Sequence, residues 1–160
     1  MLVQTKHFGE IDLAEEKILT FDNGIMGFEE YKRYTILYDS EKEAEGKRPS
    51  ISWLQCLDLK ELAIPIINPL LVKEDYNPTV EDELLAGLGE LTDENLVIFL
   101  TLTVPADITK MTSNLKAPIV INADTRKGCQ IVAENADYQV RFPVYEQFKK
   151  NREEKEGNVC

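Results

Sequence analysis

The side chains that most often carry out chemistry are scarce in this chain. His7 is the only histidine, and the three cysteines, Cys56, Cys129 and Cys160, lie far from one another in the sequence. A Ser-His-Asp or Cys-His mechanism would need His7 as its base, and no pattern brings a serine or cysteine toward it. The histidine and cysteines also lack a zinc-binding spacing, and the acidic segments lack the Asp-x-Asp-x-Asp-Gly pattern of calcium loops. We therefore expect no catalytic residue and no metal site.

Sequence motifs for phosphate-bearing cofactors are missing as well. The segment Gly87-Leu88-Gly89 follows a helical pattern rather than a strand, and no G-x-x-x-x-G-K-[ST] segment occurs. We therefore expect no bound cofactor. With 29 acidic residues, two carboxylates could still meet as in a glycoside hydrolase, so a small hydrolase stays open as one alternative.

The charge of the chain bears on its partners. The 18 basic and 29 acidic side chains give a net charge of −11. Because phosphates are held by Lys and Arg, this balance disfavours direct nucleic-acid binding and suits a basic protein partner. Trp53, Tyr34 and Tyr38 alternate with polar residues and could stack on bases, so a single-stranded RNA-binding barrel is the second alternative. Packing of these three rings in a core explains the same pattern.

Composition and length indicate a single compact protein. Hydrophobic residues make up 43% of 160, and a chain of this length buries roughly 70% of its extended surface. An odd number of scattered cysteines and the lack of a leader-like segment indicate reduced thiols in the cytoplasm. The longest apolar run, Leu96 to Val104, is too short to cross a bilayer. We expect a cytoplasmic protein that does not bind membranes and is monomeric in isolation.

The apolar residues recur mostly with a period of two, which is typical of strands. Nine segments show this pattern: Leu2 to Lys6, Lys17 to Phe21, Tyr34 to Tyr38, Ile51 to Cys56, Leu62 to Ile67, Leu96 to Val104, Pro118 to Asn122, Cys129 to Ala133 and Tyr138 to Phe142. Turn-forming residues separate them, including Thr125 to Gly128, which reads as a hairpin loop. The sequence therefore predicts an all-β fold, a small antiparallel β-barrel-like domain with one or two short helices.

Helical spacing occurs in one stretch. Val80, Leu84, Leu85 and Leu88 share a face, Thr79 could cap the helix with Asp82 at the third position, and Gly87 or Gly89 could end it. Residues 28–31 could form a second, single turn. We predict one domain over residues 1–142, with residues 39–50 as an exposed loop and residues 143–160 as a charged tail that begins with a docked turn.

Five segments in order resemble the FliW family of flagellar assembly factors. The most specific is TSNLKAPIVINADTRKGCQIV, which matches the family pattern Asn-Leu-x-Ala-Pro-Ile-Val-Ile-Asn followed by Arg-x-Gly-x-Gln. The other four are FDNGIMGFEEY, Trp53-Leu54-Gln55, Ile67-Asn68-Pro69 and Asp75-Tyr76. The resemblance implies a non-enzymatic barrel that holds newly made cytoplasmic flagellin. It further implies that the freed protein binds the RNA-binding repressor CsrA and relieves its repression of flagellin messenger RNA.

The residues of these motifs also have structural explanations. Gly24 and Gly27 permit positive φ, Pro118 restricts the start of a strand, and the amides of Asn114 and Asn122 can bond loop backbone. We expect Phe28, Trp53 and Ile119 in the core. The motif residues that we assign to the scaffold are Gly24, Gly27, Phe28, Trp53, Gln55, Asn114, Pro118, Asn122, Arg126, Gly128 and Gln130.

Acidic residues gather in three places, at residues 39–45, 74–83 and 153–156. The middle group adjoins the expected helix and a motif tyrosine, and an ordered group loses less entropy on docking than a loop or tail does. A purely solvated face is the alternative. We therefore assign partner binding to Glu74, Asp75, Tyr76, Asp82 and Glu83.

Overall fold

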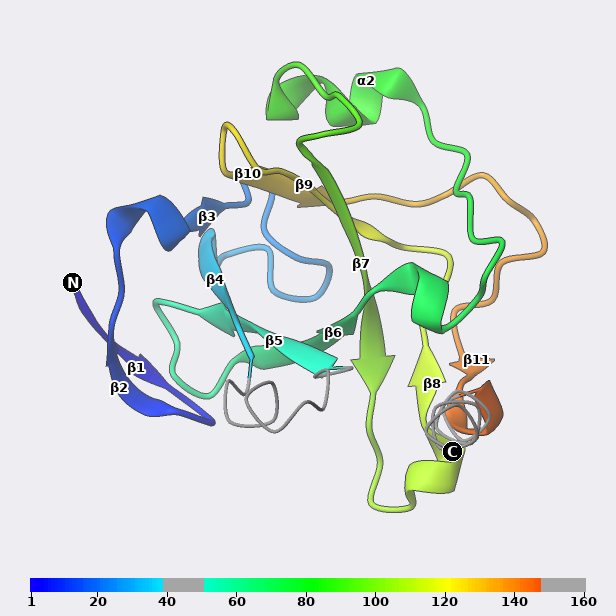
Figure 1. The fold of residues 1–160 in the computed structure, drawn as a ribbon, viewed down its shortest axis with the longest axis horizontal. Coiled ribbons are helices and arrows are strands. Elements are labelled where there is room, and N and C mark those ends of the chain that lie inside the picture. The colour runs from blue at the N-terminus through cyan, green and yellow to red at the C-terminus, as the bar shows by residue number, and fades with distance from the viewer. Residues whose placement is uncertain (39–50, 148–160) are drawn as a thin grey trace, which may run out of the picture.

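The computed structural model describes residues 1–38 and 51–147. In this part the chain is built mostly of strands, with short helical turns between them (Figure 1). The strands are β1 Leu2–Thr5, β2 Gly9–Asp12, β3 Leu19–Thr20, β4 Arg33–Leu37, β5 Ile51–Cys56, β6 Ala63–Ile67, β7 Leu96–Thr103, β8 Thr112–Ser113, β9 Ile119–Asn122, β10 Lys127–Gln130 and β11 Phe142–Pro143. The helical elements are η1 Glu15–Lys17, η2 Pro69–Leu71, α2 Asp82–Leu85, η3 Ala86–Leu88 and η4 Ile108–Lys110.

Seven of the strands close into a barrel, in the order β3, β4, β5, β6, β7, β9 and β10. Every neighbouring pair is antiparallel except the one that closes the ring, where β10 lies parallel to β3 with Lys127 opposite Thr20. The amide of Thr20 donates to the carbonyl of Arg126 at 2.9 Å in this closure. The all-β, barrel-like fold expected from the sequence is confirmed.

Three smaller pairings attach to the barrel. β1 and β2 form a separate hairpin, and β8 pairs with both β7 and β11. The sequence pattern missed β2 and β8, and it placed β3, β10 and β11 imprecisely, because strands of two to four residues show too few alternations to identify.

Alternation along the barrel strands divides the buried side chains between an interior and two outer clusters. The interior holds Leu19, Phe21, Ile25, Tyr34, Leu54, Cys56, Leu62, Ile66, Ile119 and Ile121. Outside the barrel, Ile67, Leu100 and Leu102 pack beneath Val72, Tyr76, Tyr138 and Val144, while Val120 and Ile131 pack beneath Leu88. β7 serves both sides, since Val97 and Phe99 contact the interior cluster and Ile98 contacts the outer ones.

The helix lies where the sequence placed it, with different ends. α2 begins at Asp82, and Glu81 precedes it without a side-chain cap hydrogen bond. Thr79 is not the cap, because it lies two residues before the cap position at Glu81; its amide donates to the side chain of Asn135 at 2.6 Å. The helical turns end at Gly89, whose φ of +84° makes it the expected glycine stop.

The C-terminal part of the fold extends past the expected boundary at residue 142. Pro143 belongs to β11, and Val144 is completely buried in the outer cluster with Tyr138. The docked turn that the sequence suggested after residue 142 is therefore present. The expected exposed loop at 39–50 and the tail from residue 148 lie outside the described residues.

Candidate functional site

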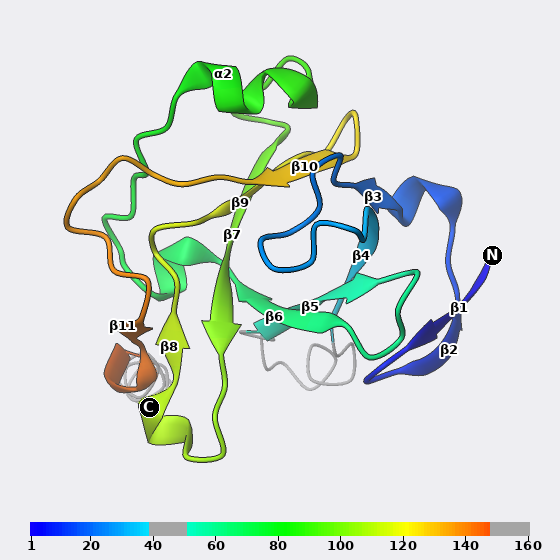
Figure 2. The ribbon, with the colours of Figure 1, turned by 180° about the vertical axis from the view of Figure 1, so that it is seen from behind.

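The first family-like motif forms a tight loop that fills one end of the barrel. Phe21 and Ile25 insert into the interior cluster, and the loop lies between β10 and β5 when the barrel is seen from behind (Figure 2). Gly24 and Gly27 have φ values of +67° and +90°, as expected. A Cβ on Gly24 would lie 2.6 Å from the Cα of Glu29, so only glycine fits this fold of the loop.

The second motif, in the hairpin of β9 and β10, holds that loop in place. A Cβ on Gly128 would lie 2.6 Å from the ring of Phe21, so the glycine permits the ring to pack directly on the strand. The side chain of Gln130 accepts from the amide of Met26 at 2.9 Å and donates to the carbonyl of Ala117 at 3.1 Å. Arg126 has a φ of +60° at the tip of the hairpin. Two motifs that are distant in the sequence therefore form one bonded unit.

Three motif amides tie loops to strands. Asn122 is fully buried, accepts from the amides of Asp124 and Thr125, and donates to the carbonyls of Leu88 and Glu90. Asn114 accepts from two successive amides, at residues 116 and 117, just before buried Pro118. Gln55 is buried too, with its carbonyl oxygen held by the amide of Lys6 at 3.0 Å. Through these contacts the three side chains link loops to strands.

Two aromatic residues lie elsewhere than the sequence suggested. Phe28 was expected in the core and is 39% exposed, beside exposed Met26, because the positive-φ turn at Gly27 directs this end of the loop outward. Trp53 is only partly buried, and its ring lies against His7 with centroids 3.9 Å apart and the planes tilted by 32°. Ile119, by contrast, is completely buried as expected.

The three rings that might have formed a base-stacking platform do not share a face. Trp53 pairs with Leu37, whereas Tyr34 pairs with Cys56, so Trp53 and Tyr34 point to opposite sides of the sheet. Tyr34 is completely buried and only Tyr38 of the three is strongly exposed. This arrangement gives no support to the RNA-binding alternative.

The acidic group from residue 74 to 83 is divided between two places. Glu74 and Asp75 follow η2, and Asp82 and Glu83 form the exposed start of α2 at the other end of an ascending segment (Figure 1). Asp75 pairs with Lys73 at 3.0 Å, which lowers the pKa of the carboxyl. The four carboxylates are available to a partner, and their role in binding one stays a prediction.

Tyr76 lies among these acidic residues and is itself buried. Its ring stacks on Tyr138 with centroids 5.0 Å apart, and its hydroxyl donates to the carbonyl of Leu115 at 2.9 Å. Only 8% of the residue is exposed, so most of its side chain packs within the fold, and its assignment to partner binding stays a prediction. It anchors the segment that carries the acidic side chains.

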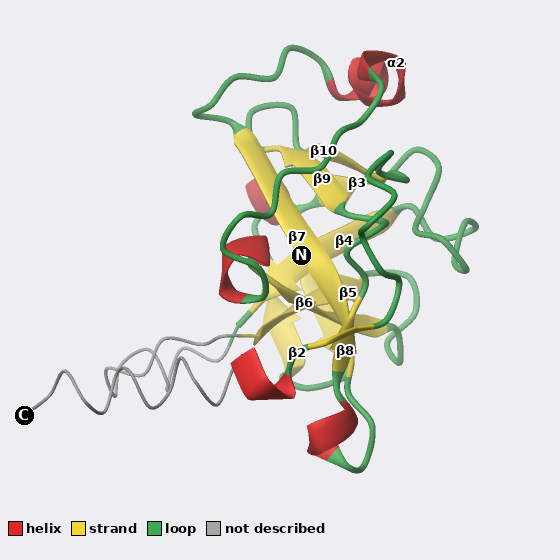
Figure 3. Cartoon of the chain, turned by 90° about the vertical axis from the view of Figure 1, so that its right-hand side faces the viewer, coloured by secondary structure: helices red, strands yellow, loops and turns green. Residues whose placement is uncertain are grey.

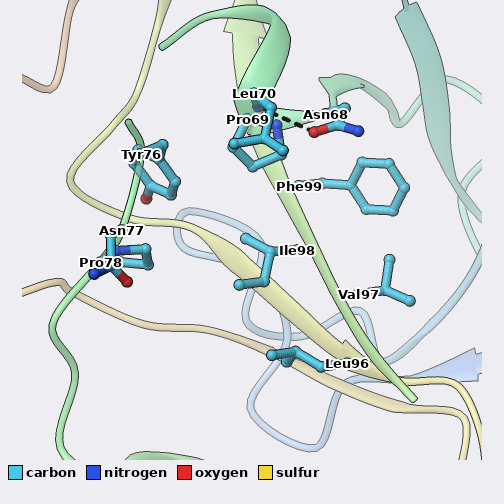
Figure 4. Close-up of a pocket in the computed structure, with 10 residues that line it drawn as sticks. All are labelled: Asn68, Pro69, Leu70, Tyr76, Asn77, Pro78, Leu96, Val97, Ile98 and Phe99. Atoms are coloured by element: carbon cyan, nitrogen blue, oxygen red, sulfur yellow. Dashed lines mark hydrogen bonds between the residues drawn. The ribbon is translucent and has the colours of Figure 1, made fainter. Parts of the chain in front are cut away.

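A pocket of about 410 Å³ opens beside β7 and had no signal in the sequence. One wall is β7 itself, where Leu96 and Ile98 point toward the segment of Tyr76 to Pro78, and Val97 and Phe99 point away from it (Figure 4). The other walls are η2, with its preceding Asn68, and that segment, residues 76–78. The walls come from three parts of the chain, which is why local patterns could not reveal the pocket.

Comparison with known proteins decides the family. A family model described as FliW protein matches residues 2–144. The chain belongs to the FliW family. The flagellar assembly factor FliW of Lachnoclostridium phytofermentans is 59% identical over 160 residues, which is 100% of both chains. That of Thermotoga maritima is 36% identical over 153 residues, covering 95% of this chain and 98% of the relative.

A solved structure agrees with this assignment. The crystal structure of a flagellar assembly factor FliW superposes with a TM-score of 0.80 at 28% sequence identity, covering 91% of this chain and 97% of that one. The shared fold therefore agrees with membership of the FliW family.

The reactive groups of this FliW-family chain have environments that suppress ionisation. Burial raises the pKa of the Cys56 and Cys129 thiols, and burial followed by the charge of Lys6 lowers the pKa of His7. The hydroxyl of Tyr34 is buried with no hydrogen-bond partner in the described part of the chain, and burial raises its pKa. Within residues 1–38 and 51–147, no three His, Cys, Asp or Glu side chains are grouped to hold a metal ion. No helix in the same residues is both long and apolar enough to cross a membrane.

Proposed function

We propose that this chain holds newly made flagellin in the cytoplasm and that, once flagellin is exported, it binds CsrA and relieves repression of flagellin messenger RNA. Membership of a family of flagellar assembly factors is the observation that carries the proposal. The net charge of −11 supports it further, because an acidic surface attracts a basic RNA-binding protein and repels the RNA itself. Binding alone, without catalysis, is sufficient for this function.

The proposed switch needs the two partners to disfavour each other. A standard interface buries about 800 Å² per partner, so two sites could overlap or lie apart on a domain of this size. Exchange of partners requires a coupling free energy of at least about 1 to 3 kcal/mol, whether the sites overlap or communicate.

Calorimetric titration against purified flagellin and purified CsrA tests the proposal. We expect saturable binding of each partner alone and a weaker affinity for CsrA when flagellin is present in excess. A ternary complex in which neither affinity changes would contradict the switch. Absence of binding to both proteins would refute the proposed function.

A further inference from the structure

The pairing between β6 and β7 does not extend to the first residues of β7. Ile67, the last residue of β6, pairs with Leu100, and the residue that would lie opposite Ile98 if the ladder continued is Pro69. Pro69 has no amide hydrogen, and its carbonyl accepts from the amides of Val72 and Lys73 as η2 turns away. The edge of β7 is therefore uncovered on the β6 side around Ile98, while the amide of Leu96 donates to the carbonyl of Thr92 at 3.1 Å.

The backbone of β7 shows which groups face that uncovered edge. The carbonyl of Asn95 accepts from the amide of Ala123, and that of Thr101 accepts from the amide of Asn114. The backbone amides and carbonyls of the odd-numbered residues therefore point toward β9 and β8. Because strand residues alternate, the amide and carbonyl of Ile98 face the opposite edge. Among the described residues, neither group of Ile98 has a partner there.

The pocket described above lies along this edge. Its walls are mainly apolar, and its volume of about 410 Å³ falls within the range of sites that bind ligands. Leu70 and Leu96 line it and are 57% and 38% exposed. Natural proteins usually block an open strand edge with charges, bulges or a covering loop, whereas this stretch of β7 has no charged residue and directs Leu96 and Ile98 toward the pocket.

Exposed carboxylates stand at the two ends of the lining segments. Asp93 and Glu94 precede β7 in the chain, and Glu74 and Asp75 precede Tyr76. Lys73, which pairs with Asp75, is the basic residue in these neighbouring stretches. A ligand that matches these surroundings has apolar side chains that contact the walls and basic side chains that pair with the carboxylates at the rim.

We propose that the open edge of β7 binds an extended segment of a partner protein, rich in apolar and basic residues, as an added β-strand. The segment's backbone bonds the amide and carbonyl of Ile98, and its apolar side chains enter the space between β7 and residues 76–78. The proposal rests on the proposed function, because a protein that acts by holding other proteins needs a surface that binds them.

Amide exchange measured by NMR on the full chain tests the mode of binding. The probe is the peptide acetyl-Lys-Val-Lys-Val-Lys-Val-Lys-amide, and the control is the same peptide methylated on every backbone nitrogen. We expect the unmethylated peptide to bind saturably and to slow exchange of the Ile98 amide. Equal binding of both peptides, binding without protection of Ile98, or no saturable binding would each overturn the proposal.

Two substitutions test the position of the site. Ile98→Pro removes the outward amide, and we expect it to weaken peptide binding about three- to tenfold, as loss of one hydrogen bond predicts. Leu70→Lys places a charge in the groove without altering the backbone, and Leu2→Lys, on distant β1, is its matched control with 68% exposure. We expect weaker binding for Leu70→Lys only. If Ile98→Pro does not fold, the comparison of Leu70→Lys with Leu2→Lys still tests the position of the site.

The same measurements with flagellin and CsrA separate this inference from the proposed function. Binding of either protein that is unchanged by Leu70→Lys and leaves Ile98 unprotected would sustain the function and refute the edge site. Peptide protection of Ile98 without binding of either protein would sustain the edge and refute the function. Protection of Ile98 that depends only on protein concentration would show a second copy of the chain as occupant and overturn the proposal.

Discussion

Two regions of this small barrel differ in how completely their backbone is covered. At one end, glycines and a side-chain amide let the loop of residues 21–31 pack closely on the β9–β10 hairpin. At the open edge of β7, the ladder stops at Pro69 and an apolar pocket takes its place. Figure 3 shows β7 running between α2 and β8 on this side of the molecule. The motif residues thus secure the scaffold, while the space for a ligand lies where pairing ends.

Proline substitutions on β7 should separate the closed edge from the open one most strongly. Val97→Pro removes an amide that faces β9, and we expect a loss of about 4 kcal/mol in the free energy of unfolding from the unpaired carbonyl and lost packing. Ile98→Pro removes an amide that has no partner within residues 1–38 and 51–147, so it should cost clearly less. Urea unfolding measures both. Equal losses would show that the β6 side of β7 is not open.

The two glycine turns with the same φ test how closed the motif loop is. Gly24→Ala brings a Cβ against the backbone of Glu29 and should cost about 3 kcal/mol. Gly9→Ala has the same φ of +67° with nothing within 4 Å, so it should cost about 1 kcal/mol. Thermal unfolding followed by circular dichroism measures the difference. Similar melting temperatures for the two variants would contradict the close approach at Gly24.

Substitution of Asn122 and of Asn114 compares how much their side-chain amide contacts stabilise the fold. Asn122→Ala leaves buried carbonyls and amides unpaired on both sides and should cost about 3 kcal/mol, whereas half-buried Asn114→Ala should cost about 1 to 2 kcal/mol. The melting temperatures should follow this order. An unchanged melting temperature for Asn114→Ala together with lost partner binding would place Asn114 in an interface instead.

Charge reversal tests the acidic start of α2. We expect Asp82→Lys with Glu83→Lys to weaken CsrA binding by about 1 kcal/mol, and added salt to weaken the native complex. Glu15→Lys with Glu16→Lys is the control, since both residues are also exposed and begin a short helical turn. Calorimetry with CsrA measures the affinities. Identical affinities for both variants, or no effect of salt, would mean that these carboxylates serve solubility.

The smallest expected effect concerns the exposed pair of Arg33 and Asp58, whose Nε and Oδ2 atoms are 3.2 Å apart. The hydrogen bond from Arg33 lowers the pKa of Asp58 below 3.8, so the pair stabilises the fold above that pH and stops doing so as pH falls through the lowered value. Asp58→Asn should therefore cost less than about 1 kcal/mol at neutral pH and nothing in strong acid. Unfolding by urea across the acidic range measures this. Asp93→Asn, at an exposed carboxylate before β7, is the control. The same pH dependence of unfolding for both variants would show that the pair of Arg33 and Asp58 does not stabilise the fold.

Local patterns identified much of the scaffold. The strand patterns placed the chain of β4, β5, β6, β7 and β9 within a few residues, and the hairpin before Gly128 was recognisable from its turn residues. The family-like motifs predicted correctly that Gly24 takes positive φ and that Asn122 bonds loop backbone. These features depend on residues close together in the chain, so they leave a local signature.

Tertiary structure decided everything that depends on distant segments. The burial of Tyr76 follows from its stacking on Tyr138, and the exposure of Phe28 follows from the way its loop docks on the β9–β10 hairpin. The parallel closure between β3 and β10 could not be read from strands this short. The pocket is the clearest case, because it exists only where Pro69 ends one ladder beside a strand that begins almost thirty residues later. Sequence thus determined the longer strands of the barrel, because their alternation is local, and packing determined the short strands and which edge stays open.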